Sequence, residues 1–203
     1  MKTWIKICGV ANAEDAIAAA QFGADAVGLV FHGPSLRCCS LGVAQQILAK
    51  LPPTFAVVGV WLEEPASAIM GTATKLRLTS IQTYSPETAE ALVQAGYNVI
   101  PAIMPSDSAA LDAEWAQLIR SCQFTRVIVD YRRCTNLTET WDPADLAPLR
   151  SRTDVVLAGG LTDDNIAIAL SELVESQWLG VDEAKEVAYS WMFGNANDFF
   201  RLG

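Results

Sequence analysis

Short apolar stretches rich in β-branched residues alternate along the chain with longer stretches of helical periodicity. Strands of a parallel sheet are buried on both faces, so this alternation is typical of repeated βα units. The pattern predicts eight strands, at residues 4–8, 25–31, 55–61, 77–82, 97–102, 126–130, 154–158 and 178–182. The eighth is the weakest of these predictions, because its apolar run is short.

The segments between the predicted strands carry helix start and stop signals. Asn12 is predicted to cap a helix that Gly23 ends, and Pro65 and Pro86 suit the first turns of two others. Seven helices are predicted, at residues 12–22, 41–50, 65–75, 86–96, 107–121, 143–149 and 163–174, followed by a terminal helix rich in aromatic residues.

Eight βα units in 203 residues match the lower size limit of the TIM (βα)8 barrel. No linker rich in Pro, Gly or Ser divides the chain, so we expect one α/β domain spanning residues 1–203. A doubly wound open sheet is the alternative architecture. It usually has fewer strands and a Gly-rich first turn, which this sequence lacks.

Composition narrows the classes of partner. Apolar residues make up 51% of the chain and charged residues 18%, a balance typical of a packed interior. The net charge of −9 disfavours binding to nucleic acid or to an anionic membrane, although backbone amides can still bind a phosphorylated small molecule. The sequence has neither an apolar run of roughly 18 residues nor a secretory signal, so we expect a cytoplasmic protein.

The cysteines indicate free thiols in a reducing compartment. They are odd in number and show no CxxC spacing: Cys8, Cys38, Cys39, Cys122 and Cys134. With His32 as the only histidine, the sequence offers no zinc quartet, and we expect no metal.

The first predicted strand ends in residues whose side chains could take part in catalysis. In a barrel the catalytic groups lie at the carboxyl ends of the strands, where Lys6 and Cys8 would share one face. A Lys charge is costly to bury unpaired, so a core role alone does not explain it. Cys8 could serve as a base or nucleophile if its neighbours stabilise the thiolate, or it could be a buried structural thiol, and the pattern leaves both open.

Other strand ends add candidate groups. Asp130 ends an apolar strand with no helix directly behind it, which favours a functional carboxyl group over a helix cap. Arg37 could bind a carboxylate or be a solvated loop residue. Gly159 and Gly160 could bind phosphate through their backbone amides or merely form a tight turn. Asp182 ends the eighth predicted strand and either faces a ligand or caps the last helix.

Several of these segments together resemble the phosphoribosylanthranilate isomerase family of tryptophan biosynthesis. The matching segments fall in the same order over about the first 170 residues: Lys6-Ile7-Cys8-Gly9, residues 23–31, Ser35-x-Arg37 with Ser40, Leu51-Pro52-Pro53, Val58-Gly59-Val60, Gln82, Asp130, and residues 157–162 with Asn165. The first-strand motif and the Gly-Ala-Asp strand after it are the most specific.

The resemblance implies a TIM-barrel isomerase that performs an Amadori rearrangement without a cofactor. It implies that Asp130 is the general acid that opens the sugar ring and that Cys8 is the general base at C2. It also implies that Arg37 contacts the anthranilate carboxylate and that Gly159-Gly160 supply half of a phosphate site. Lys6, Gln82 and Asp182 are then expected to contact the phosphorylated sugar-anthranilate substrate, in a monomer or a homodimer.

Three segments depart from the family pattern. Val181-Asp182-Glu183 stands where the family has a phosphate-binding Ser-Ser-Gly turn, Arg132-Arg133 replaces a Gly-rich sixth loop, and the usual Gln-Leu-His of the fourth strand is Gln82-Thr83-Tyr84. The arginines of the sixth loop are candidates to bind the phosphate instead. The departures leave two alternatives: an isomerase of another sugar amine, or a barrel that has lost catalysis and binds a partner.

Overall fold

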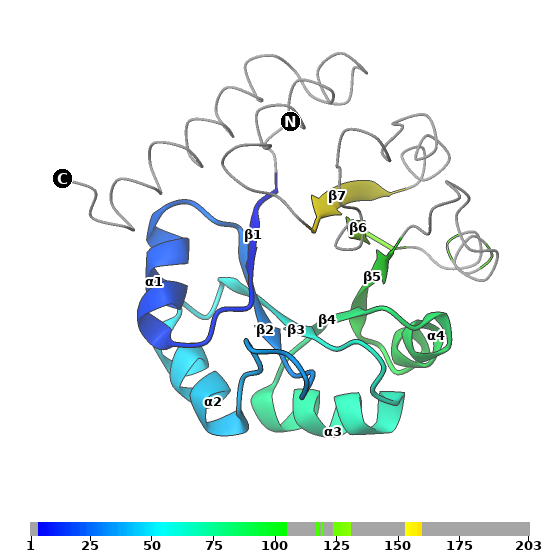
Figure 1. Ribbon diagram of the computed structural model, residues 1–203, viewed down its shortest axis with the longest axis horizontal. Helices are drawn as coiled ribbons and strands as arrows, with labels where there is room; N and C mark the ends of the chain where they lie inside the picture. Colours follow the sequence, from blue (N-terminus) through cyan, green and yellow to red (C-terminus); the bar gives the residue numbers. More distant parts are fainter. Residues whose placement is uncertain (1–3, 105–116, 118, 120–123, 131–152, 160–203) are drawn as a thin grey trace, which may run out of the picture.

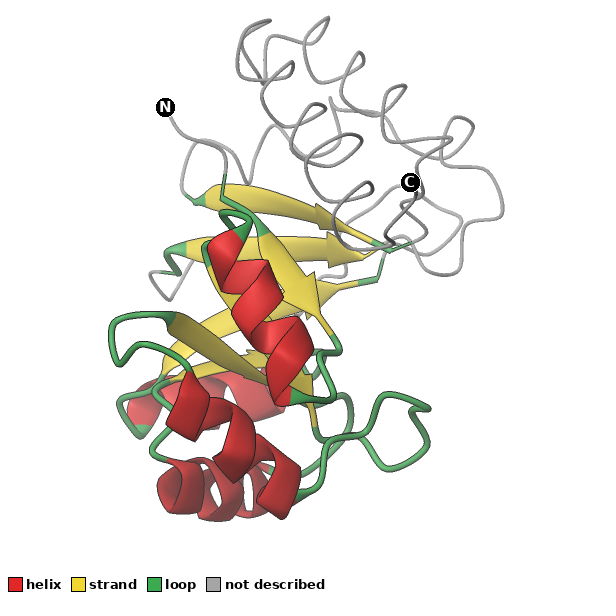
Figure 2. Ribbon diagram, turned by 90° about the vertical axis from the view of Figure 1, so that its left-hand side faces the viewer, coloured by secondary structure: helices red, strands yellow, loops and turns green. Residues whose placement is uncertain are grey.

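The described part of the chain folds as a curled parallel sheet with helices on its outer side (Figure 1 and Figure 2). The computed structural model describes residues 4–104, 117, 119, 124–130 and 153–159. Its strands are β1 Lys6–Cys8, β2 Ala26–Val30, β3 Ala56–Val60, β4 Ser80–Thr83, β5 Asn98–Ile103, β6 Arg126–Asp130 and β7 Asp154–Ala158. These described strands pair in chain order, every pair parallel, as βα units require.

Four helices connect the first five strands and cover the outer face of the sheet (Figure 1): α1 Ala13–Gln21, α2 Leu41–Lys50, α3 Ala66–Leu76 and α4 Pro86–Gln94. The predicted N-cap is confirmed, because the side chain of Asn12 accepts a hydrogen bond of 2.7 Å from the amide of Asp15. Ser40 and Ser85 cap α2 and α4 in the same way. Within the described part of the chain, no helix combines the length and the apolar character that spanning a membrane would need.

The two faces of the sheet bury different clusters, as the period of two along a strand requires. One face packs against the helices through residues such as Val27, Leu29 and Val127. The opposite face encloses a smaller interior cluster: Ala26, Val30, Val58, Val60, Ile100, Ala102 and Ile128, with Trp4, Cys8, Tyr84, Val156 and Ala158 packed against it. Even-numbered strand residues therefore point to the interior.

A contact between distant strands shows how far the sheet curls. Trp4 lies just before β1, and the guanidinium carbon of Arg126 at the start of β6 lies 4.6 Å from the centre of its ring. β1 and β6 are not neighbours in the described sheet, so the sheet must bend round to bring these side chains together. The described strands are thus a curled seven-stranded α/β sheet.

The predicted elements correspond to the observed ones with shifts at their ends. The fourth strand begins at Ser80 and not at Arg77, because Arg77 has the left-handed backbone (φ 55°) that ends α3. Pro65 precedes α3 as its N-cap residue and lies outside the first turn. The predicted eighth strand and the helices predicted at 143–149, 163–174 and the C-terminus lie outside the described residues. Of the helix predicted at 107–121, only residues 117 and 119 are described, and both are helical.

Candidate active site

The thiol of Cys8 and the ammonium group of Lys6 converge on one glycine. Cys8 pairs with Gly28 of the neighbouring strand β2. A Cβ atom built on Gly28 would lie 3.0 Å from Cys8 Sγ and 3.2 Å from Lys6 Nζ. The prediction that Lys6 and Cys8 share a face is therefore confirmed. The interior face therefore brings a thiol and a cationic group to the same spot on β2.

Arg37 lies across the turn that follows Cys8. Its Nη1 donates a hydrogen bond of 3.0 Å to the carbonyl oxygen of Cys8. Two observations favour glycine at position 9. A Cβ there would lie 2.7 Å from Arg37 Cδ, and the backbone of Gly9 has a positive φ of 82°. Arg37 itself is exposed, which leaves its guanidinium group at the edge of the site beside Cys8.

A chain of hydrogen bonds links β4 to the carboxyl group of Asp130. Gln82 Nε2 donates to the hydroxyl oxygen of Tyr84 at 3.0 Å, and that hydroxyl donates to Asp130 Oδ2 at 2.6 Å. Gln82 is 2% exposed and Asp130 is 3% exposed. Burial strengthens such bonds, since no water competes for them. Asp130 thus ends β6, as the sequence predicted, and the structure adds that its carboxyl group is buried.

The remaining predicted site residues divide into described and undescribed positions. Gly159 directly follows β7 and has a positive φ of 85°, a backbone conformation that favours glycine. Gly160, Asp182, Arg132 and Arg133 lie outside the described residues. The strand-end aromatic residues Phe31 and Trp61 stack on each other at 4.8 Å and belong to the helix-facing cluster, so they do not line the interior.

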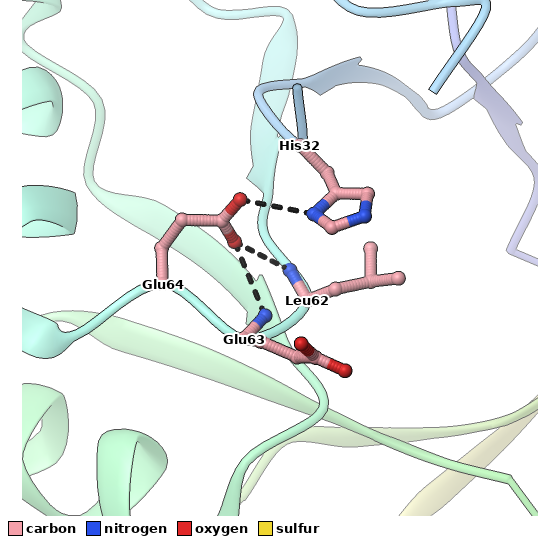
Figure 3. A network of polar contacts seen from close by, with 4 residues as sticks. All are labelled: His32, Leu62, Glu63 and Glu64. Carbon is pink, nitrogen blue, oxygen red and sulfur yellow. Dashed lines mark hydrogen bonds and ion pairs between the residues drawn. The ribbon is translucent and has the colours of Figure 1, made fainter. Parts of the chain in front are cut away.

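His32 joins two loops that leave the carboxyl ends of β2 and β3 (Figure 3). Its Nδ1 lies 3.0 Å from Glu64 Oε1, while Glu64 Oε2 accepts hydrogen bonds from the amides of Leu62 and Glu63 at 2.9 and 3.2 Å. Glu64 therefore shapes the third loop and ties it to the second. The only histidine of the sequence thus has a structural partner.

Removing this carboxylate is expected to cost stability more than activity. Glu64→Ala should lower the free energy of unfolding by about 1–2 kcal/mol, because two amides and one imidazole lose their partner. Urea titration followed by circular dichroism measures the loss. Glu63→Ala is the matched control, because Glu63 is exposed and only its amide takes part in the cluster. Equal stability of the two variants would contradict this assignment.

The described cysteines differ in environment. Cys8, Cys38 and Cys39 are free, as predicted, and Cys122 and Cys134 lie outside the described residues. Burial raises the pKa of the Cys39 thiol, and the adjacent Cys38 raises it further, so Cys39 stays protonated in the folded protein. In the described part of the chain, no group of His, Cys, Asp or Glu side chains could hold a metal ion.

Sequence reasoning missed two residues of this arrangement. Gly28 was part of a matching segment, but its closeness to Cys8 and Lys6 depends on the pairing of β1 with β2. Tyr84 was noted only as a departure from the family pattern. The signal that points to it is alternation, since it lies two residues after Gln82 and so shares its face.

A curled parallel sheet with a thiol, an ammonium group and a buried carboxyl group on its interior face is typical of an α/β enzyme that moves protons. The family model described as N-(5'phosphoribosyl)anthranilate (PRA) isomerase matches residues 5–186. The chain belongs to this isomerase family.

Individual relatives agree with the family. The chain is 35% identical over 171 residues to N-(5'-phosphoribosyl)anthranilate isomerase of Geobacter sulfurreducens, an alignment that covers 82% of this chain and 81% of the relative. The crystal structure of phosphoribosyl anthranilate isomerase from Thermotoga maritima is similar, with a TM-score of 0.69 at 29% identity over 86% of this chain and 84% of that one. A crystal structure of a phosphoribosyl anthranilate isomerase in complex with reduced 1-(o-carboxyphenylamino)-1-deoxyribulose 5-phosphate is also similar. Its TM-score is 0.67 at 29% identity, over 86% of this chain and 84% of that one.

Proposed function

We propose that this chain is an isomerase that converts N-(5-phosphoribosyl)anthranilate into 1-(2-carboxyphenylamino)-1-deoxyribulose 5-phosphate, the Amadori rearrangement of tryptophan biosynthesis. The observation that carries the proposal is the presence of Cys8 and Asp130 on the same interior face of one curled sheet. Cys8 packs against the interior cluster together with Tyr84, and Tyr84 donates its hydroxyl hydrogen to Asp130. We propose that the sheet is completed as an eight-stranded barrel and that residues 1–203 form one domain.

Asp130 acts first, as the general acid. Its carboxyl proton passes to the ring oxygen of the ribose, the bond between that oxygen and C1 breaks, and the lone pair of the anthranilate nitrogen forms a C=N bond to C1. A buried carboxyl group suits this step, because burial excludes water that would compete for the proton. The product of the step is an open-chain iminium ion and the Asp130 carboxylate.

Cys8 then acts as the general base. Its thiolate removes the proton from C2, and the electron pair of the C–H bond forms a C1=C2 double bond while the iminium nitrogen becomes neutral. The adjacent iminium makes that proton acidic enough for a thiolate to remove. The hydroxyl group on C2 finally loses its proton as C1 gains one, which gives the ketone. Lys6 presents its ammonium group on the same face, beside Gly28, and would contact the substrate there.

The remaining candidates would hold the substrate. Arg37, beside Cys8 at the edge of the site, is placed to bind the anthranilate carboxylate with its guanidinium fork. Gly159 and Gly160 would offer backbone amides to the phosphate, with Arg132 and Arg133 in place of the family's eighth-loop turn. Gln82 supports the acid through Tyr84, and Asp182 is the remaining candidate for substrate binding.

Conversion of freshly generated phosphoribosylanthranilate, followed by the loss of its fluorescence, tests the proposal. The wild type should turn the substrate over, and Cys8→Ala should lose at least about a hundredfold in kcat, the usual contribution of a general base. Cys38→Ala is the matched control, because that thiol is exposed and outside the interior cluster. A folded wild type without turnover, or a Cys8→Ala variant as active as Cys38→Ala, would refute it. Turnover of the non-phosphorylated aminoaldose alone would identify a different sugar amine as substrate.

A further inference from the structure

Tyr84 occupies a position that connects two interior residues of different strands. Its hydroxyl oxygen accepts a hydrogen bond of 3.0 Å from Gln82 Nε2 and donates one of 2.6 Å to Asp130 Oδ2. Gln82 lies on β4 and Asp130 on β6, so the contact spans the intervening strand β5. A hydroxyl–carboxyl distance of 2.6 Å is in the range of short, charge-assisted hydrogen bonds.

The directions of the two hydrogen bonds bear on where the acid proton lies. The amide nitrogen of Gln82 can only donate, so a lone pair of the Tyr84 oxygen accepts from it. The phenol hydroxyl in turn donates to Asp130 Oδ2. In this arrangement Oδ1 is the oxygen that can carry the transferable proton of the neutral carboxyl group.

We propose that Tyr84 is a positioning residue for the general acid of this isomerase, with Gln82 as the residue that orients the phenol. This inference rests on the proposed function. Tyr84 holds one oxygen of Asp130, keeps the acid proton on the other, and stabilises the carboxylate that forms as the proton leaves for the ring oxygen. The last effect grows along the reaction, because the acceptor gains a full negative charge. It should therefore raise kcat more than it strengthens substrate binding.

Burial supports this role over that of a surface tyrosine. Gln82 and Asp130, which both bond to the Tyr84 hydroxyl, are 2% and 3% exposed, so neither can exchange this partner for bulk water. Gln82 Oε1 is buried and has no hydrogen-bond partner among the described residues, so the amide is oriented by its bond to the phenol alone. A buried amide that leaves its own acceptor unsatisfied is retained at a cost in stability, which suits a functional orientation.

The kinetic test compares Tyr84→Phe with Tyr97→Phe. The second variant removes a hydroxyl whose bond to Thr74 is exposed, and it should behave as the wild type. Tyr84→Phe should lower kcat by about 10- to 100-fold with little change in KM, the range for one hydrogen bond to a charged group. Tyr84→His retains a ring N–H donor and should recover part of that loss. An unchanged kcat in Tyr84→Phe, or a loss confined to KM, would overturn the proposal.

A double-mutant cycle separates positioning from general destabilisation. In the Asp130→Asn background, where the acid proton is absent, Tyr84→Phe should have a much smaller effect on kcat than in the wild type. Multiplicative effects of the two substitutions would mean that Tyr84 acts independently of Asp130, and would contradict the assignment.

A spectroscopic test of the hydrogen bond does not depend on turnover. In protein labelled with ¹³C at tyrosine Cζ, the resonance that disappears in Tyr84→Phe belongs to Tyr84. It should shift in Asp130→Ala and in Gln82→Leu, and stay in place in Cys38→Ala. A resonance that does not move in Asp130→Ala would refute the hydrogen bond itself. If the Tyr84 resonance differs between the wild type and Asp130→Ala, but the wild type shows no turnover, the hydrogen bond is confirmed. The proposed function and the positioning role of Tyr84 would both be overturned.

Discussion

Replacing Asp130 by asparagine is expected to lower kcat for the rearrangement by about 10²- to 10⁴-fold, the usual contribution of a positioned general acid. The substitution removes the transferable proton but keeps the shape of the side chain. The amide oxygen of asparagine can still accept the hydrogen bond that Asp130 Oδ2 accepts from Tyr84. The loss of kcat should therefore come from the missing proton and not from a change in the fold. Steady-state kinetics followed by substrate fluorescence will measure it.

The control for this prediction is binding of an inert ligand. The reduced 1-(o-carboxyphenylamino)-1-deoxyribulose 5-phosphate found with a related isomerase cannot react, so its Kd reports the site without the chemistry. The Kd of Asp130→Asn for this ligand should lie within about threefold of the wild-type Kd. This corresponds to about half of the 1.4 kcal/mol that a tenfold change represents. If kcat were retained while Kd rose, Asp130 would be a binding residue, and another group would have to supply the proton.

The local pattern of apolar and polar residues was sufficient to predict the strands and the face of the sheet that carries Lys6 and Cys8. The apolar runs predicted every described strand, because a buried parallel strand must be apolar on both faces. Alternation then predicted that Lys6 and Cys8 share a face, which their common closeness to Gly28 confirms. Errors were confined to ends such as Arg77, where a left-handed residue ends α3 before β4 begins.

Contacts between strands could not be predicted from the same pattern. The pairing of Cys8 with Gly28 depends on the register of β1 against β2, which the alternation of either strand alone leaves undetermined. The bond from Tyr84 to Asp130 crosses β5, so it depends on the curl of the sheet. Arg37 reaches back to the Cys8 carbonyl from a loop, whose path follows no hydrophobic period. These contacts assemble the site. The sequence pointed to Lys6, Cys8, Arg37, Gln82 and Asp130 beforehand, but it missed the roles of Gly28 and Tyr84.

A valine side chain at position 28 is expected to lower kcat by about as much as the lower end of the range expected for loss of the acid. Its Cβ would lie 3.0 Å from Cys8 Sγ and 3.2 Å from Lys6 Nζ, closer than ordinary van der Waals contact. The thiol and the ammonium group would have to move apart or move together off this spot. Since a displacement of about 1 Å can cost roughly a hundredfold in rate, Gly28→Val should lose about that factor in kcat, and Gly28→Ala less.

The matched control is Gly42→Ala, at an exposed position of α2 where a Cβ would meet nothing within 4 Å. It should leave kcat unchanged and add up to about 1 kcal/mol of stability, because alanine favours the helix. Thermal unfolding followed by circular dichroism shows whether the Gly28 variants remain folded. A graded fall in kcat from glycine to alanine to valine, in folded proteins, would mean that the empty space at position 28 is part of the catalytic site. A Gly28→Val variant with wild-type kcat would show that Lys6 and Cys8 work without being held over that spot, and position 28 would then have no part in catalysis.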